Sequence, residues 1–414
     1  MESKKNILVI GNSSTVSVFA KIIAKYSNVG KIYSTYKILN APDNIEFVDI
    51  REDAAEELLK FAITNDVNLT AVFSQKALKS DIAGIFNANG QLIFAPELKC
   101  AKQLADKSCL KKLLYKLKVK IPQFGIFDKQ TSANDYLKKT NLPVIISSPE
   151  ITTEDDLFAC PTLSVGNIAI NDLFFRGEEK VILDEYISGH NFTTYIITDG
   201  VSAIPIATLS TEKFSDDVEG GFLTPGSAAF TPDLKITQDI ENYMVYDVWE
   251  KLSSDFEKSN CSYVGIAGIC GVLKNDELFI TDIHPGIVSA DAPVLLNVLD
   301  ENLISLFEAC AIGSFTDDYD VVNTKDNAII SLGMFSNSSE KDINWTESLL
   351  NPDNIDFCTK NFNNKYITKK GFIGTIWAEG RTITTAKQKL YEDIDTLSSN
   401  GIKFRKDLLL TKVY

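Results

Sequence analysis

The sequence predicts a protein of mixed α/β and α+β class, for three reasons. In residues 1–97, short apolar strands alternate with amphipathic helices, which is typical of a doubly wound parallel sheet. Between Val181 and Thr208, alternating runs that end at Gly189 and at Asp199-Gly200 predict antiparallel hairpins. In residues 323–414, strands are followed by a helix, the pattern of a small α+β domain.

The N-terminal part shows the parallel pattern most clearly. A buried strand, Asn6–Ile10, ends at Gly11, and a helix is expected at Val16–Tyr26. The further elements expected here are strands at Lys31–Tyr36, Glu46–Ile50 and Leu69–Phe73 and a helix at Ala54–Asn65. No G-x-G-x-x-G pattern follows the first strand, so a dinucleotide site is not expected. We predict that Gly11 follows a central parallel strand.

The rest of the chain is expected to form three further parts. The predicted division is 1–97 for the doubly wound domain, 98–180 for a helical linker and a small subdomain, 181–322 for a larger sheet, and 323–414 for the α+β domain. The helices expected beyond residue 97 are Leu98–Leu117, Ser132–Thr140, Thr237–Ser254, Val294–Ala311 and Ile383–Leu397; the strands include Leu142–Ser147, Tyr263–Leu273, Leu278–Gly286, Ala328–Met334 and Gly371–Ala378. No Gly-rich or Pro-rich linker separates the parts, so they are expected to pack as one body.

Composition excludes several classes of function. A formal charge of −15 argues against a nucleic-acid partner, because phosphate binding needs clustered Lys and Arg. No apolar run has the length of a membrane span, and no targeting segment is evident, so a cytoplasmic location without membrane partners is expected. The seven Cys form no C-x-x-C pair, which indicates neither a disulfide framework nor a zinc site. Only His190 and His284 are available for histidine chemistry.

Several stretches resemble phosphoribosylamine–glycine ligase, the glycinamide ribonucleotide synthetase of purine synthesis, an ATP-grasp enzyme. Three motifs of that family are V-I-E-E-F-L-x-G-E-E, A-T-S-Q-D-H-K-R and T-G-G-M-G-A-Y-S-P. At the matching positions, residues 181–232 of this chain contain V-I-L-D-E-Y-I-S-G-H-N, A-T-L-S-T-E-K-F and T-P-G-S-A-A-F-T-P. The run Ala105–Lys111 is similar to G-S-K-x-F-x-K, Asp282-Ile283-His284 stands where the family has E-F-N, and Gly401–Asp407 resembles G-x-x-x-R-x-D. The resemblance implies an ATP-grasp architecture with an N-terminal doubly wound parallel domain and a small C-terminal α+β domain.

The resemblance also implies roles for residues at matching positions. The ATP-binding candidates are Lys107, Glu185, Ile187 and Asn191, the substrate candidates are Lys213, Asp217 and Gly226, and the metal candidates are Asp282 and His284. Catalytic residues stay unassigned. The implied cofactors are ATP and Mg²⁺, and an active enzyme would use glycine and phosphoribosylamine as small-molecule substrates. Residues two apart in a strand share a face, so Asp282 and His284 should enter one cleft beside Lys107 and Glu185.

Other positions depart from the family pattern. Ser147 stands where the family has a second lysine, and residues 148–156 replace a Gly-rich loop with a Pro, no Gly and four acids. A Gly-rich loop offers unhindered backbone N–H groups to phosphate oxygens, which this loop does not. Asn191 replaces the ribose acid, and Ser14–Ser17 replaces charged residues of the sugar-phosphate loop. These changes predict weak nucleotide binding, weak use of Mg²⁺ and little or no glycine ligation.

Alternative interpretations stay open at each of these places. Residues 181–232 also fit an ordinary antiparallel sheet, and Lys107 also fits a solvated helix face among neighbouring lysines. His284 also fits a polar residue that is hydrogen-bonded at the strand end before Pro285. For the whole chain, the alternatives to a ligase with an eroded active site are a related ligase with a changed substrate and a non-catalytic ATP-grasp paralogue that serves as a binding or scaffold protein.

Overall fold

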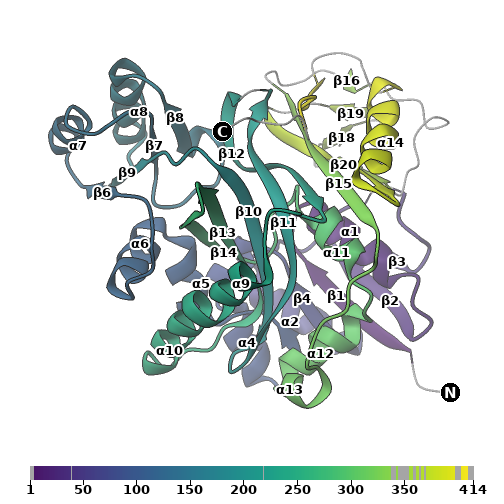
Figure 1. Cartoon of the computed structure of the whole chain (residues 1–414). Helices are drawn as coiled ribbons and strands as arrows, with labels where there is room; N and C mark the ends of the chain where they lie inside the picture. The colour runs from purple at the N-terminus through teal and green to yellow at the C-terminus, as the bar shows by residue number, and fades with distance from the viewer. Residues whose placement is uncertain are drawn as a thin grey trace.

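The computed structural model describes residues 4–38, 40–217, 219–336, 342–343, 354–357, 360–362, 365–367, 370–396 and 402–408. A long antiparallel sheet runs through the middle of the molecule (Figure 1). The N-terminal parallel sheet, a small subdomain and the C-terminal part lie around it. This arrangement confirms the predicted α/β and α+β class.

The N-terminal sheet is parallel, with the strand order β3-β2-β1-β4-β5. Its elements are β1 Lys5–Ile10, α1 Ser14–Ile23, β2 Val29–Ser34, β3 Ile45–Phe47, α2 Ala55–Thr64, β4 Val67–Val72, α3 Gln75–Lys79, α4 Ile82–Ala88 and β5 Ile93–Phe94. Gly11 follows the central strand β1, as predicted. A Cβ at Gly11 would lie 2.7 Å from Val16 Cγ2, so the close approach of helix α1 to this strand end requires glycine.

Two helices, α5 Leu98–Ala105 and α6 Lys107–Lys116, occupy the region where the sequence predicts one helical section. The chain is extended at Asp106, and its carboxylate accepts the backbone N–H groups of Ser108 and Cys109 at 2.8 and 3.1 Å. Asp106 therefore acts as the N-cap of α6 and makes Lys107 the first residue of that helix.

The small subdomain is an antiparallel sheet of order β6-β9-β7-β8, with helices α7 and α8 packed in one hydrophobic cluster against it. Its elements are β6 Phe124–Phe127, α7 Gln130–Leu137, β7 Val144–Ser147, the 3-10 turn Glu154–Asp156, β8 Leu157–Cys160, α8 Leu163–Phe175 and β9 Val181–Glu185. Strand β9 leads from this subdomain directly into the long sheet.

The long sheet is antiparallel, with the order β14-β13-β10-β11-β12-β15-β20-β17, and β21 pairs with β15. Its strands are β10 His190–Asp199, β11 Ala203–Asp216, β12 Gly220–Thr231, β13 Val264–Lys274, β14 Glu277–Pro285, β15 Ala328–Ser336, β17 Ile355–Phe357, β20 Gly371–Gly380 and β21 Ile402–Lys403. A separate sheet contains β16 Asp342–Ile343, β18 Lys360–Phe362 and β19 Lys365–Ile367. Because β12 pairs with β15, the sheet continues across residue 322, where the sequence suggests a domain boundary.

The remaining helices are α9 Gln238–Asn242, a π-helical segment Tyr243–Trp249, α10 Glu250–Lys258, α11 Ala292–Val298, α12 Leu303–Ile312, α13 Phe315–Asp318 and α14 Ile383–Thr396. The helix expected at Val294–Ala311 is divided, because the Asn302 side chain caps a new helix by accepting two backbone N–H groups. The expected helix end at Leu397 and Gly401 of the C-terminal motif lie outside the described residues. None of the helices in the described ranges has the length and apolar character needed to cross a membrane.

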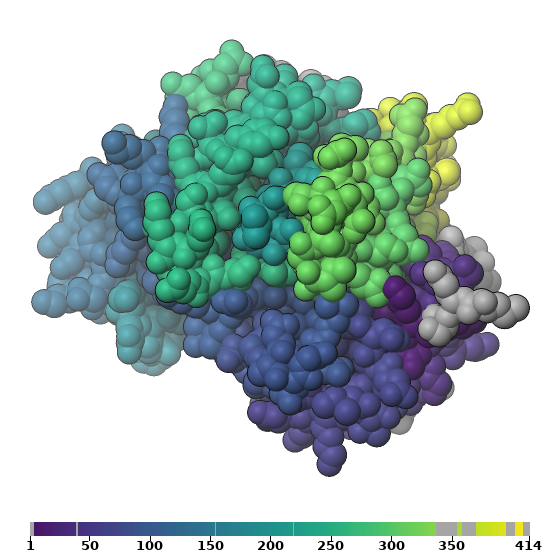
Figure 2. All heavy atoms as spheres, turned by 90° about the horizontal axis from the view of Figure 1, so that it is seen from below, coloured from purple at the N-terminus to yellow at the C-terminus, as the bar shows by residue number. Residues whose placement is uncertain are grey.

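One hydrophobic core joins the N-terminal sheet to the long sheet. Phe307 of α12 stacks on Phe94 and Phe19, with ring centroids 4.0 and 5.1 Å apart. Figure 2 shows the segment of α12 and α13, in light green, lying against the N-terminal body in purple. The aromatic contacts hold the two sheets in one packed body.

Candidate functional site

The first pair of the candidate site joins helix α6 to strand β14. Lys107 Nζ lies 2.5 and 2.7 Å from the two carboxylate oxygens of Asp282, and both side chains are largely buried. Burial is the largest influence and would raise the pKa of Asp282, but the charge of Lys107, its hydrogen bond and the nearby His284 and Lys213 together outweigh burial and lower this pKa. Asp282 is therefore held as a carboxylate, with both oxygens facing one ammonium group.

A second pair lies one helical turn further along α6. Lys111 Nζ is 2.9 Å from Asp184 Oδ1 of β9, and the exposed fractions of the two side chains are 8% and 12%. Burial raises the pKa of Asp184, although the charge of Lys111 opposes the shift. We call Lys107, Asp282, Lys111 and Asp184 the lysine–aspartate cluster. The sequence analysis did not choose Lys111 or Asp184, although the spacing of four residues from Lys107 to Lys111 could have indicated a shared helix face.

The other ATP-binding candidates lie around the end of β9. Glu185 follows Asp184, so its side chain is on the opposite face of the strand, where its carboxylate accepts the backbone N–H of Gln123 at 3.4 Å. Ile187 is buried, and Asn191 is half-buried in β10 opposite Val272. The structure thus places Asp184, and not Glu185, against the lysines of α6.

His284 lies beyond Asp282 on the same face of β14. Its exposed fraction is 9%, and Nε2 has no hydrogen-bond partner within the described part of the chain. The ring lies over Gly268, where a Cβ would be 2.3 Å from His284 Cε1, and its centroid is 5.8 Å from that of Tyr195. Burial lowers the pKa of His284, so the imidazole is neutral near pH 7.

A buried tyrosine–aspartate pair adjoins His284. The Tyr195 hydroxyl donates to Asp291 Oδ2 at 2.7 Å and accepts the backbone N–H of Val288 at 3.3 Å. Burial raises the pKa of Asp291 to about 6. Asp291 Oδ1 has no hydrogen-bond partner among the described residues, and a Cβ at Gly226 would lie 3.3 Å from it. Gly226, a substrate candidate, therefore packs closely beside an unpartnered carboxylate oxygen, and a Cβ there would also lie 2.8 Å from Val288 Cγ1.

The remaining substrate candidates separate in space. Lys213 Nζ is 3.4 Å from Thr281 Oγ1, and its charge acts on the pKa values of Asp282 and Asp291, which places it near the lysine–aspartate cluster. Asp217 has different partners: one carboxylate oxygen accepts the backbone N–H groups of Lys406 and Asp407 at 2.6 and 3.0 Å. Asp217 thus holds the C-terminal segment.

The metal candidates do not fit a Mg²⁺ site made by the protein. Both oxygens of Asp282 are bonded to Lys107, and His284 offers an imidazole nitrogen where Mg²⁺ prefers oxygen. Within the described ranges, no group of three or more His, Cys, Asp or Glu side chains could hold a metal ion. Any Mg²⁺ at this site would have to depend mainly on ligands from a nucleotide.

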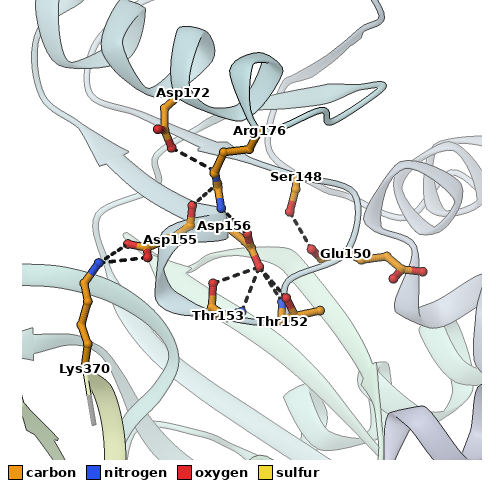
Figure 3. A network of polar contacts seen from close by, with 9 residues as sticks. All are labelled: Ser148, Glu150, Thr152, Thr153, Asp155, Asp156, Asp172, Arg176 and Lys370. Atoms are coloured by element: carbon orange, nitrogen blue, oxygen red, sulfur yellow. Dashed lines mark hydrogen bonds and ion pairs between the residues drawn. The ribbon is translucent and has the colours of Figure 1, made fainter. Parts of the chain in front are cut away.

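The acidic loop after β7 is folded against three cationic side chains, two of which, Arg176 and Lys370, are drawn in Figure 3. Lys79 Nζ of α3 is 2.5 Å from Glu150, and Lys370 Nζ is 2.9 Å from both carboxylate oxygens of Asp155. Arg176, at the end of α8, is 3.0 Å from Asp156. The other oxygen of Asp156 accepts the backbone N–H groups of residues 152 and 153, both at 2.9 Å. Three of the four acids of this loop, Glu150, Asp155 and Asp156, therefore each face a cation.

Comparisons with known proteins agree with this architecture. The sequence model of the phosphoribosylglycinamide synthetase ATP-grasp (A) domain matches residues 105–278. The phosphoribosylamine–glycine ligase of Clostridium acetobutylicum is 23% identical over 412 residues, covering 97% of this chain and 99% of that protein. Among solved structures, the phosphoribosylamine–glycine ligase of Thermotoga maritima matches with a TM-score of 0.74 and 16% identity, covering 97% of this chain and 99% of the other.

A further solved structure extends the likeness beyond the glycine ligases. The biotin carboxylase domain of 2-oxoglutarate carboxylase from Hydrogenobacter thermophilus, solved with MgADP, ADP and bicarbonate, matches with a TM-score of 0.69 and 12% identity. It covers 98% of this chain and 92% of that one. The chain therefore has an ATP-grasp architecture, and it is similar over nearly its whole length to the phosphoribosylamine–glycine ligases.

Proposed function

We propose that this chain is a phosphoribosylamine–glycine ligase-like protein that binds ATP weakly and has an eroded active site with little or no ligase activity. The full-length similarity to such ligases supports an ATP-grasp function of the purine-synthesis type. The state of the lysine–aspartate cluster supports weak binding. In this proposal glycine and phosphoribosylamine are the ancestral substrates, and no nucleic acid or membrane takes part.

The observation that carries the proposal is that Lys107 and Lys111, the two largely buried lysines of α6, are each ion-paired with an aspartate. An ATP phosphate must displace Asp282 from Lys107, and a second one must displace Asp184 from Lys111. Exchange of a partly buried ion pair for a phosphate contact gives little net free energy, because a favourable Coulomb interaction is lost as another forms. Ser147 supplies no further positive charge.

The loop over the expected phosphate position supports the same proposal. Residues 148–156 are held by hydrogen bonds within the loop and by Lys79, Arg176 and Lys370. A loop that binds a triphosphate must turn free backbone N–H groups towards it. Here the N–H groups of residues 152 and 153 are already bonded to Asp156, so they are unavailable to phosphate.

Ligation needs more than nucleotide binding. Formation of an acyl phosphate requires neutralisation of phosphate charge and an acceptor held in line with it. No described group of side chains provides a Mg²⁺ site, and the positions of the sugar-phosphate loop are small polar residues of α1, such as Ser14 and Ser17, which are fully buried. We therefore assign no catalytic residue.

Calorimetric titration of the full chain with ATP, with and without Mg²⁺, tests nucleotide binding directly. We expect a dissociation constant above about 10 μM, which corresponds to less than about 7 kcal/mol of binding free energy. Lys107→Ala should weaken binding further, whereas Lys112→Ala, on the exposed side of the same helix, should not change it. Sub-micromolar affinity that Lys107→Ala leaves unaffected would contradict the proposal.

Catalysis is tested by complementation of a purine-requiring strain that lacks its own ligase. We expect no growth without purine, and growth would show that the ligase activity is intact.

The second candidate function is that of a non-catalytic paralogue that serves as a binding or scaffold protein. The ion pairs of the acidic loop favour it, because they fix the loop to cations from three parts of the chain. Nucleotide binding without release of ADP or phosphate would favour this candidate.

A further inference from the structure

Two buried cysteines from distant parts of the chain face each other. Cys100 of α5 and Cys261, just before β13, have their sulfur atoms 2.7 Å apart, and 161 residues separate them in sequence. The exposed fractions are 0% for Cys100 and 8% for Cys261. A disulfide bond has a length of about 2.05 Å, so closing the gap requires a movement of about 0.7 Å.

The backbone around the two cysteines is already held in place. The N–H of Glu97 donates to the carbonyl of Ser262 at 3.2 Å, and Lys99 contacts the carbonyl of Ser259. These contacts fix the start of α5 against the turn that precedes β13. A covalent link between the sulfurs can therefore form with side-chain movement alone.

We propose that Cys100 and Cys261 are a reversible oxidation site at which a peroxide converts the two thiols into a disulfide. The Cys261 sulfur, the more accessible of the two, attacks one peroxide oxygen, the O–O bond breaks, and a sulfenic acid and water form. The Cys100 sulfur then attacks the sulfenic sulfur and releases a second water. Two thiols and one hydrogen peroxide thus yield one disulfide and two waters, and an added dithiol reverses the reaction.

Burial sets the rate of this reaction. Cys261, which reacts first, is only 8% exposed, so peroxide reaches it slowly. Burial raises the pKa of the Cys100 thiol, and the contact with Cys261 adds to the shift, so little Cys100 thiolate exists at neutral pH for the second step. Oxidation should therefore be slower than at the exposed Cys109, which has no cysteine facing it in the described structure. Cys109 should stop at a sulfenic or sulfinic acid, while the buried pair proceeds to the disulfide.

The link would connect the elements that carry the lysine–aspartate cluster. Helix α5 leads directly into α6, whose first residue is Lys107, and β13 pairs with β14, which carries Asp282. A disulfide that closes so long a loop restricts the unfolded chain. We expect the oxidised protein to have a Tm higher by a few degrees, with α5, the helix that precedes Lys107, tied to the segment before β13.

The experiment treats the folded full chain with hydrogen peroxide, blocks the remaining thiols with iodoacetamide, and identifies linked peptides by mass spectrometry after non-reducing digestion. We expect one dominant link, Cys100 to Cys261, with the loss of two hydrogen atoms and reversal by dithiothreitol. Cys109→Ser should still form the link, whereas Cys100→Ser and Cys261→Ser should not.

The wild-type chain makes the proposal testable even if a cysteine variant fails to fold. A link that forms equally in urea-unfolded protein would show random pairing and overturn the proposal. The proposal would also be overturned if folded protein, treated with peroxide until Cys109 is fully oxidised, contained no linked Cys100–Cys261 peptide. A Tm that is unchanged in protein shown to be linked would overturn the expected effect on stability.

Discussion

At the scale of single residues, burial shifts the pKa values of His284 and Asp291 in opposite directions. It lowers the pKa of the histidine and raises that of the aspartic acid, so each group favours its neutral form. The Tyr195 hydroxyl bonds one oxygen of Asp291, while the other oxygen and His284 Nε2 have no described partner. These two unpartnered atoms are the groups that the first two predictions address.

The first prediction concerns the metal interpretation of His284. The asparagine found in the resembling family would give the β14 position an oxygen ligand beside Asp282. In His284→Asn we expect the ratio of ATP affinities with and without Mg²⁺ to rise by about tenfold, measured by calorimetry. Asp282→Asn combined with it should remove the gain. Identical magnesium dependence in His284→Asn and the wild type would show that the pair has no metal role.

The second prediction concerns pH and Asp291. Its pKa is raised from 3.8 to about 6, so the folded state binds the proton more tightly than the unfolded state. The free energy of unfolding of the wild type relative to Asp291→Asn should therefore increase as pH falls from 6 towards 4. The expected gain is on the order of 3 kcal/mol for a shift of about two units.

Urea unfolding of both proteins across this pH range measures the effect of Asp291. The asparagine keeps an oxygen that can accept the Tyr195 hydroxyl, so the comparison isolates the buried charge. The contributions of His284 and Asp282 have the opposite sign, because both pKa values are lowered, and they are largely common to the two proteins. A constant difference between the proteins from pH 4 to 7 would contradict a raised pKa.

At the scale of elements, the loop after β7 behaves as a compact turn fixed at both ends. Thr153 and Asp156 form a capping box at the 3-10 turn, and the pKa of Asp156 is lowered because hydrogen bonds outweigh the effect of its burial. The exposed fraction of the Asp156 side chain is 8%, whereas that of Asp155 is 55%. Of these two ion pairs of the loop, Arg176–Asp156 has a buried carboxylate, whereas both side chains of Lys370–Asp155 are mostly exposed.

The third prediction follows from this contrast. Arg176→Ala leaves the Asp156 carboxylate without its cation and should lower the free energy of unfolding by about 1–3 kcal/mol. Lys370→Ala removes a pair whose side chains are 67% and 55% exposed, and it should change stability by less than about 0.5 kcal/mol. Urea titration at pH 7 measures both. Equal losses of unfolding free energy in the two variants would show that burial does not determine how much each ion pair of this loop contributes to stability.

At the scale of the whole molecule, the C-terminal segment is tied to the long sheet by one buried arginine. The exposed fraction of Arg405 is 1%; its guanidinium lies 3.0 Å from Glu212 of β11 and bonds both oxygens of Asp407. Asp217 holds the adjacent backbone. The Arg-x-Asp part of the C-terminal motif therefore holds the C-terminal segment against β11, the strand that contains the substrate candidate Lys213.

The fourth prediction tests this closure. Arg405→Ala leaves Glu212 and Asp407 without their buried cation and should cost about 3–5 kcal/mol. Arg405→Lys keeps the positive charge and should recover only part of the loss, because one ammonium group cannot bond both oxygens of Asp407 as the guanidinium does. Lys403→Ala, which removes a mostly exposed partner of Asp216, is the matched control and should be close to neutral. Thermal unfolding of the three variants ranks their stabilities. An Arg405→Ala variant as stable as the wild type would show that Arg405 does not hold the C-terminal segment to the long sheet.

The sequence by itself determined the order of strands and helices, because hydrophobic periodicity is a local property of the chain. It placed Gly11 after a central parallel strand, and the short motif around Lys107 pointed to a lysine that the structure pairs with Asp282 in a largely buried position. Local patterns also predicted the α/β and α+β class, and the resemblance to the glycine ligases implied the ATP-grasp architecture. The cap at Asp106 was readable as well, since aspartate commonly begins a helix, although the sequence analysis passed over it.

The tertiary structure decided which charges face each other. Lys107 and Asp282 are 175 residues apart, and Lys370 and Asp155 are 215 apart, so no local pattern reveals either pair. The choice between Asp184 and Glu185 depended on which face of β9 meets α6, and that is set by packing between elements. Charge pairing and pKa shifts depend on distance and burial in three dimensions, and these quantities exist only once the chain has folded.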